Sequence, residues 1–192
     1  MSDKFARSMT WFFKTIADVF FAKRYGHRAV VLETVAAVPG MVAGMWSHFE
    51  SLRNLDRGHG TKIHRMLAEA ENERKHLIFF LHIAKPSLLE RIIIIIAQII
   101  FTIFYLFMYI FFRGTAHRMV GYFEDEAVNS YTNYLAQIEN KQIKNVSAPQ
   151  IAIDYYGLAQ DAKLKELVKC VREDERKHAQ VNHKYADSIL RK

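Results

Sequence analysis

Apolar residues recur at the spacing of a helix face along most of this chain. With only 8 Gly and 3 Pro among 192 residues, the sequence favours long helices over a sheet with many turns. Lys85-Pro86-Ser87 is its clearest break, and residues 141–161 read as a connection. We therefore expect an all-α fold in a single domain over residues 1–192, with core helices near 27–48, 61–83, 116–140 and 163–189.

Two further segments are more apolar than a soluble bundle needs. Residues 92–112 contain 21 residues without a charge, between Arg91 and Arg113, and by hydropathy alone they could cross a membrane. Residues 1–22 have an amphipathic pattern in which aromatic side chains stand beside basic ones. This first helix either covers the core or lies in a membrane surface, and the pattern leaves both open.

The pattern Glu-x-x-His occurs twice, as Glu73 with His76 and as Glu175 with His178. Each copy sits in a helical context, where residues three apart share one face, so a carboxylate and an imidazole can bind one metal ion together. A single copy is weak evidence, because charged helices produce the pattern by chance and its residues are then simply solvated.

One further acid precedes each copy. Glu33 lies in a stretch that is nearly all apolar, where burying a carboxylate that nothing neutralises costs roughly several kcal/mol. Glu124 lies in FEDEA on the apolar side of its helix, with Tyr131 one heptad later, whereas Asp125 and Glu126 point elsewhere because neighbours on a helix differ by about 100°. A metal ion would neutralise both inward acids.

Taken in order, the six residues give Glu, Glu-x-x-His, Glu, Glu-x-x-His, the ligand order of ferritin-like di-iron carboxylate bundles. The separations of 40 residues from Glu33 to Glu73 and 51 from Glu124 to Glu175 each fit two helices and a connection. Oxygen-rich ligands with one imidazole per metal suit iron or manganese. We predict a ferritin-like di-iron four-helix bundle with additional membrane-interfacial helices. Since all ligand helices must meet, we prefer residues 92–112 to lie in one leaflet or against the bundle, with a true span as the alternative.

Charge, cysteine content and the first residues limit the binding partners and the compartment that we expect. The net charge of +7 fits binding to nucleic acid, to anionic lipid or to neither, but the aromatic clusters favour lipid, so we expect no nucleic-acid partner. The only cysteine, Cys170, excludes an intrachain disulfide and a Cys-rich zinc site. The first residues lack the apolar core and cleavage site of a secretory signal, so we expect a chain that needs no import, as in a bacterium, or a mature form.

From about Lys23 onward the sequence resembles the alternative oxidases, the cyanide-insensitive ubiquinol oxidases of respiratory membranes. That family has LET, NERMHL, LEEEA and RxDExxH where this chain has LET at 32–34, NERKHL at 72–77, FEDEA at 123–127 and RxDExxH at 172–178. The run APQIAIDYYGL at 148–158 is also close to the family's. Departures at Lys75, Phe123 and Asp125 remove no proposed ligand.

The resemblance implies an enzyme, a ubiquinol:oxygen oxidoreductase that reduces dioxygen to water with two quinols and pumps no protons. It also implies two iron ions per chain, a homodimer, and monotopic attachment to the lipid of one leaflet. We expect the bacterial inner membrane, or the mitochondrial inner membrane if the chain is a processed form.

The resemblance further implies roles for individual residues. The metal ligands would be Glu33, Glu73, His76, Glu124, Glu175 and His178, and Tyr131 would be the redox tyrosine. The quinol site would include Arg28, His117, Phe123 and Ala127, while the ligands would be oriented by Asn72, Asp174 and Tyr155. From the residues alone, ordinary core packing for Tyr131 and an interfacial lipid contact for Arg28 stay open.

Two other functions share part of this pattern. A membrane-bound di-iron quinone-biosynthesis hydroxylase has the same six-ligand order, but it would need an outside reductant and would insert oxygen into its product. A non-catalytic ferritin-like iron-binding protein, or a membrane-attached scaffold, is the other alternative. The long apolar stretch at 92–112 argues against a soluble iron cage.

Overall fold

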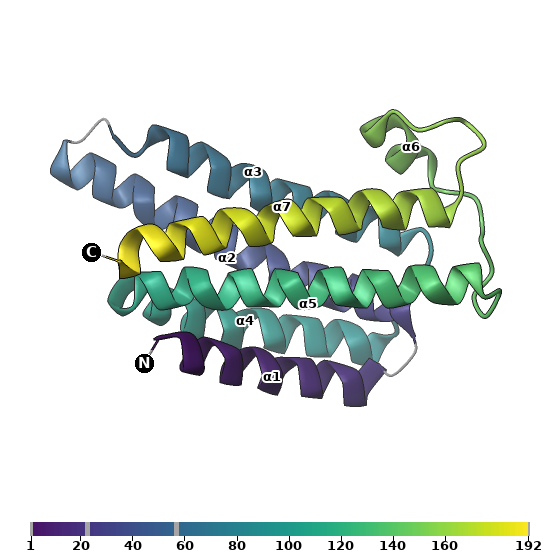
Figure 1. Cartoon of the computed structure of the whole chain (residues 1–192), viewed down its shortest axis with the longest axis horizontal. Helices are drawn as coiled ribbons and strands as arrows, with labels where there is room; N and C mark the ends of the chain where they lie inside the picture. The colour runs from purple at the N-terminus through teal and green to yellow at the C-terminus, as the bar shows by residue number, and fades with distance from the viewer. Residues whose placement is uncertain (1, 22–23, 56–57, 192) are drawn as a thin grey trace. The chain divides into compact units, whose positions relative to one another are not determined.

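In the computed structural model the described residues, 2–21, 24–55 and 58–191, form seven α-helices and no β-strand. Figure 1 labels them in chain order as α1 (Ser2–Phe21), α2 (Tyr25–Asn54), α3 (Gly60–Leu81), α4 (Leu88–Phe111), α5 (Arg113–Glu139), α6 (Gln150–Tyr156) and α7 (Leu164–Leu190). The prediction of an all-α fold is therefore confirmed.

The chain divides into two compact units. One consists of Met1–Tyr25 with His117–Lys192, and so contains α1, α6, α7 and most of α5; the other is Gly26–Ala116, with α3, α4 and most of α2. Each unit contains one of the two Glu-x-x-His helices together with the helix that supplies the preceding acid. The single domain over 1–192 stays a prediction.

In the unit 26–116, α2 packs very closely on α3. The helix is unbroken through Pro39, and the next residue, Gly40, lies directly against the α3 backbone. A Cβ placed on Gly40 would come within 2.5 Å of the carbonyl oxygen of Met66 and 3.0 Å of the Cβ of Ala70. Glycine is therefore required here for two helices to approach at this distance.

Helix α4 begins four residues before the predicted 92–112 segment because Ser87 caps it. The backbone N–H of Glu90 donates to the Ser87 hydroxyl at 3.2 Å, and the Ser87 N–H donates to the Glu90 carboxylate at 2.7 Å. Such a capping box satisfies amide groups that a helix start otherwise leaves without partners. The side-chain amide of Gln98 then ties α4 to α2 by donating to the backbone oxygen of Thr34 at 2.8 Å.

One face of α4 exposes large apolar side chains from end to end. Two described helices, α2 and α4, are long and apolar enough to cross a membrane, but 67% of the apolar window of α2 is buried against 22% of that of α4. The exposed row on α4 comprises Leu88, Leu89, Ile92, Ile95, Ile96, Ile99, Ile100, Ile103, Phe107 and Phe111. A face this long and apolar marks an interaction with lipid or with another chain.

In the other unit, α1 lies along α5. The hydroxyl of Tyr122 donates to Asp3 at 2.6 Å, and Lys14 pairs with Glu126 at 3.3 Å. Small buried residues of α1, including Ala6 and Ala17, form the packed side, and the exposed side carries Trp11, Phe12, Ile16 and Val19. The helix thus covers the core with its buried side, and its position in a membrane surface stays a prediction.

Helices α5 and α7 lie side by side in this unit (Figure 1). Their close approach depends on Gly121, where a Cβ would come within 2.6 Å of the His183 ring. The segment predicted as a plain connection, 141–161, contains the seven-residue helix α6, which ends at Gly157 with a left-handed φ of 62°. That prediction was incomplete, because one apolar cluster over two turns shows no helical period.

Candidate metal centre

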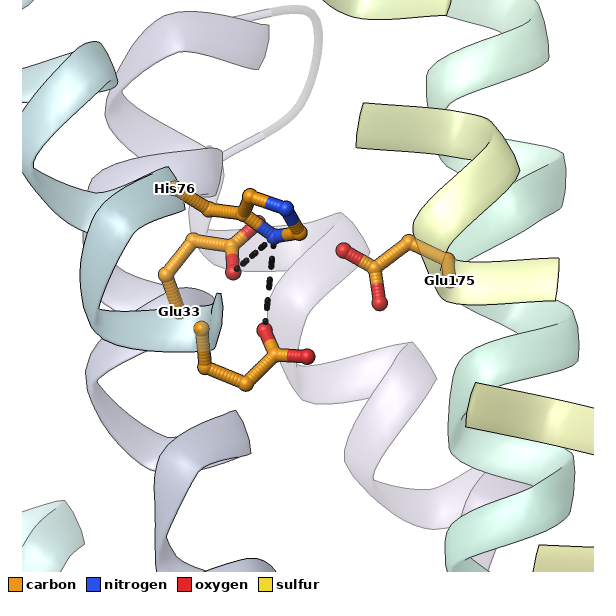
Figure 2. Close-up of side chains that lie close together, drawn as sticks. Glu33, His76 and Glu175 are labelled. Carbon is orange, nitrogen blue, oxygen red and sulfur yellow. Dashed lines mark ion pairs between the residues drawn. The ribbon is translucent and has the colours of Figure 1, made fainter. Parts of the chain in front are cut away.

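In the unit 26–116, Glu33 from α2 meets Glu73 and His76 from α3. The Nδ1 atom of His76 lies 3.4 Å from a Glu33 carboxylate oxygen and 3.7 Å from one of Glu73. Dashed lines in Figure 2 mark ion pairs of His76. Ligand atoms of all three lie within 4.8 Å of one another. The three side chains are at most 4% exposed, which is unusual for acids that lack an ionic or metal partner.

Local geometry explains this cluster. Glu73 and His76 are three residues apart on α3 and so project from one face. Glu33 is seven residues, close to two turns, before Gly40 on α2. The close Gly40 contact on α3 is made at Ala70, about one turn before Glu73, and at Met66, about two turns before it. The glycine contact therefore holds the Glu33 side of α2 against the Glu73 side of α3.

The unit that contains α5 and α7 has a matching cluster. Glu124 comes from α5, and Glu175 and His178 come from α7; Figure 2 draws Glu175 on its helix. The Nδ1 atom of His178 lies 3.7 Å from a Glu175 carboxylate oxygen, and ligand atoms of the three residues lie within 4.8 Å of one another. Exposure is 4% for Glu124, 1% for Glu175 and 9% for His178.

Each cluster has the chemistry of a metal half-site. Two carboxylates that lie together out of water repel each other, and the pair is stable only if protons or cations compensate their charge. A divalent cation with oxygen ligands and one imidazole does so, and this ligand set suits iron or manganese. The residues present therefore fit the metal that the ligand order predicts, and the identification of all six as ligands stays a prediction.

Two rows of buried residues extend these clusters along their helices. On α5, His117, Glu124 and Tyr131 recur every seven residues and are 0%, 4% and 6% exposed. On α7, Asn182 follows His178 by one turn and is 1% exposed. The predicted redox tyrosine thus shares a buried helix face with a predicted ligand.

Other predicted site residues lie in varied surroundings. Arg28 is buried on α2, Asn72 is half-buried on α3, and Phe123 and Ala127 are half-buried on α5. Phe123 packs edge-on against Phe13 of α1, with ring centroids 5.7 Å apart. Their quinol and orienting roles stay predictions.

Asp174 accepts a hydrogen bond from the hydroxyl of Tyr156 at 2.9 Å and one from Lys177 at 2.9 Å. Tyr155, predicted to orient a ligand, is 45% exposed and packs edge-on against Tyr156, with ring centroids 4.9 Å apart. The neighbouring Tyr156, which the sequence reasoning did not single out, thus holds this carboxylate from α6.

Sequence reasoning also missed the partner of His117. Its Nδ1 lies 2.9 Å from the side-chain oxygen of Asn182, and its ring lies 5.1 Å from that of Tyr185 between centroids. The position of Asn182, four residues after His178, was a usable signal because it shares the face of a predicted ligand.

The sequence is similar to one family of known proteins. A family model described as alternative oxidase matches residues 1–187. The chain is 50% identical over 190 residues to a mitochondrial ubiquinol oxidase of Batrachochytrium dendrobatidis, covering 99% of this chain and 60% of that protein. It is also 50% identical over 189 residues to ubiquinol oxidase 1c, mitochondrial, of Arabidopsis thaliana (98% and 57%), and 48% identical over 187 residues to a ubiquinol oxidase of Trachipleistophora hominis (97% and 58%). The chain thus spans about three-fifths of the length of these relatives.

Proposed function

The chain belongs to the alternative oxidase family, and from that premise we propose that it is a membrane-bound di-iron ubiquinol oxidase. In this proposal it takes four electrons from two ubiquinols, reduces dioxygen to water, and moves no protons across the membrane. The observation that carries the proposal is the pair of buried clusters, each with two carboxylates and one imidazole. Their ligand order along the chain is that of di-iron carboxylate proteins.

We propose that the six ligands hold two iron ions per chain. Bound iron would supply the redox chemistry with dioxygen, which no protein side chain provides on its own. The chain supplies the rest: Glu73 and Glu175 bring their histidines to one helix face, while Glu33 and Glu124 add charge that compensates the metal. Asn72, Asp174 and Tyr155 are assigned to orienting these ligands.

Tyr131 is assigned a redox role. It is 6% exposed and lies on the buried α5 face that carries Glu124, about two turns away along the helix. A phenol held out of water near the centre can give up an electron and a proton without contact with solvent. Arg28, His117, Phe123 and Ala127 are assigned to the quinol site, and among them the buried Arg28 and His117 provide polar groups for the quinol oxygens.

The substrate is dissolved in lipid, so the enzyme must contact a membrane. The exposed isoleucine and phenylalanine row of α4 and the exposed aromatic side of α1 have the composition for this contact. We propose monotopic attachment to one leaflet, supported by basic residues and the net charge of +7, which favour anionic lipid. The membrane would be the bacterial inner membrane or, as in the mitochondrial relatives, that of the mitochondrion.

We also propose a homodimer. A second exposed apolar row lies on α2, at Met41, Met45, Phe49 and Leu52, spaced so that all four share one helix face. A self-complementary face of this kind is the usual basis of a two-fold dimer. Chemical cross-linking through a cysteine placed at residue 45 tests it, and a variant with cysteine at exposed Lys184 serves as the control.

Oxygen uptake tests the proposed activity. Purified, iron-loaded protein in detergent or liposomes is given ubiquinol in the presence of cyanide, and uptake is expected with two quinols consumed per dioxygen. Uptake that requires an outside reductant and leaves oxygen in an organic product would instead identify a quinone-biosynthesis hydroxylase. Iron bound in hundreds per chain, or iron bound without any turnover, would identify a ferritin-like iron-binding protein.

A further inference from the structure

A buried hydrogen-bonded chain links α5 to α7 beside the predicted ligand His178. The side-chain amide nitrogen of Asn182 donates to the backbone oxygen of His178 at 3.1 Å, and its side-chain oxygen lies 2.9 Å from Nδ1 of His117. His117 is 0% exposed and Asn182 is 1% exposed. Water therefore does not compete with either contact.

The donor and acceptor in each of these hydrogen bonds are determined by the backbone oxygen of His178. A backbone carbonyl can only accept, so the NH2 group of Asn182 must face the oxygen of His178. Its amide oxygen is then the atom that faces His117, and because an amide oxygen also only accepts, the Nδ1 of His117 must carry the hydrogen. In a neutral imidazole the other nitrogen, Nε2, then has no hydrogen and is an acceptor.

We propose that Asn182 is a positioning residue that holds His117 as the Nδ1–H tautomer, so that Nε2 accepts a proton from the hydroxyl group of the bound quinol. This inference rests on the proposed quinol oxidase function and deepens it, because it assigns the direction of proton transfer within that site. The ring of Tyr185 lies 5.1 Å from that of His117 between centroids. It therefore hinders rotation of the imidazole about its side-chain bonds.

Oxidation of the quinol releases a proton to His117. The O–H bond of the quinol breaks and an N–H bond forms at Nε2 of His117, while the electrons leave the quinol for dioxygen, the terminal oxidant. The resulting imidazolium still donates its Nδ1–H to Asn182, so the hydrogen bond persists through the step. A correctly placed base of this type contributes on the order of 10² to 10⁴ in rate.

A double-mutant cycle tests this role. Asn182→Leu keeps a buried side chain of similar size but removes the accepting oxygen, His117→Leu removes the base, and the third variant combines both. Each is assayed for ubiquinol oxidation, iron content, thermal midpoint and equilibrium binding of ubiquinone without turnover. Gln180→Leu, at an exposed position of the same helix, is the control that should retain wild-type rates.

We expect Asn182→Leu to lower kcat at least about tenfold, with KM, ubiquinone binding and iron content within about twofold of wild type. In the His117→Leu background the same change should cost less than about twofold, because the group that it positions is gone. His117→Leu should remove one limb of the pH–rate profile, and Asn182→Leu should shift the pH at which that same limb occurs.

A loss that is equally large in both backgrounds, or an Asn182→Leu variant with wild-type kcat, would overturn the inference. Either result leaves the proposed oxidase function intact, since the wild-type protein would still consume oxygen. Absence of uptake in the wild type would instead reject the proposed function itself.

Discussion

Replacing Gly40 with alanine adds one methyl group at the tightest contact between α2 and α3. The new Cβ would lie 2.5 Å from the Met66 carbonyl oxygen, about 0.9 Å short of the 3.4 Å at which ordinary contact begins. A backbone carbonyl cannot swing aside, so the helices must separate. Overpacking of this kind costs about 1–3 kcal/mol, and alanine recovers about 1 kcal/mol of helix propensity over glycine. We expect a net destabilisation of up to about 2 kcal/mol.

For a chain of this length that loss lowers Tm by up to roughly 8 °C. Metal binding should suffer more, because metal–ligand distances tolerate about 0.2 Å and the contact at Ala70 lies one turn before Glu73. We therefore expect Gly40→Ala to bind clearly less iron than wild type. Circular dichroism melting in detergent and elemental analysis of the purified protein measure the two effects.

Gly44→Ala is the matched control, one turn later on the same helix. Its Cβ would meet the Leu67 side chain at 2.7 Å, and that side chain is 41% exposed and can rotate away. Gly44→Ala should keep wild-type iron content and gain up to about 1 kcal/mol. If both alanine variants were equally stable and equally loaded with iron, the steric explanation of the α2–α3 contact would be wrong.

Three further predictions concern other parts of the molecule. Tyr131→Phe should retain iron and lose nearly all ubiquinol oxidation; a fully active variant would reject the redox role. Burial raises the pKa of Tyr134 to about 12 from 10.0, so the unfolded phenol ionises first, and the free energy of unfolding should fall by about 2 kcal/mol between pH 10 and 12. Tyr134→Phe should lack this part of the alkaline loss in denaturant titrations, and an unchanged pH dependence would count against it. Replacing Ile99 and Ile103 on α4 by glutamate should weaken co-sedimentation with anionic liposomes at least about tenfold, since each isoleucine that lipid covers contributes about 1.5–3 kcal/mol to binding. Undiminished binding would show that α4 does not contact lipid.

The features that sequence reasoning predicted were mainly local. Glu73 and His76 are three residues apart, so a helical context was enough to put them on one face, and Glu33 was identified because its neighbours are apolar. The start of α4 was missed by four residues, because Ser87 and Glu90 are polar in the sequence and only their reciprocal hydrogen bonds make them part of the helix. Capping chemistry outweighed the hydropathy pattern there.

The features that it missed depend on helix register. The spacing of Asn182 from His178 puts it on the face of a predicted ligand, but its contact with His117 depends on how α5 and α7 pack, which that spacing does not report. The same is true of Gly121, which reads as an ordinary helix-weakening glycine until the ring of His183 is seen against it. The helical periodicity of α5 or of α7 does not predict a contact between residues that are about 60 positions apart.

We propose that Glu33, Glu73, His76, Glu124, Glu175 and His178 together hold one di-iron centre. The most direct test is Mössbauer and magnetic measurement on protein loaded with iron-57, combined with elemental analysis. The proposal predicts two irons per chain whose spins are coupled, and loss of that coupling in His76→Ala. One iron per chain, no iron, or two irons that remain magnetically independent would contradict it.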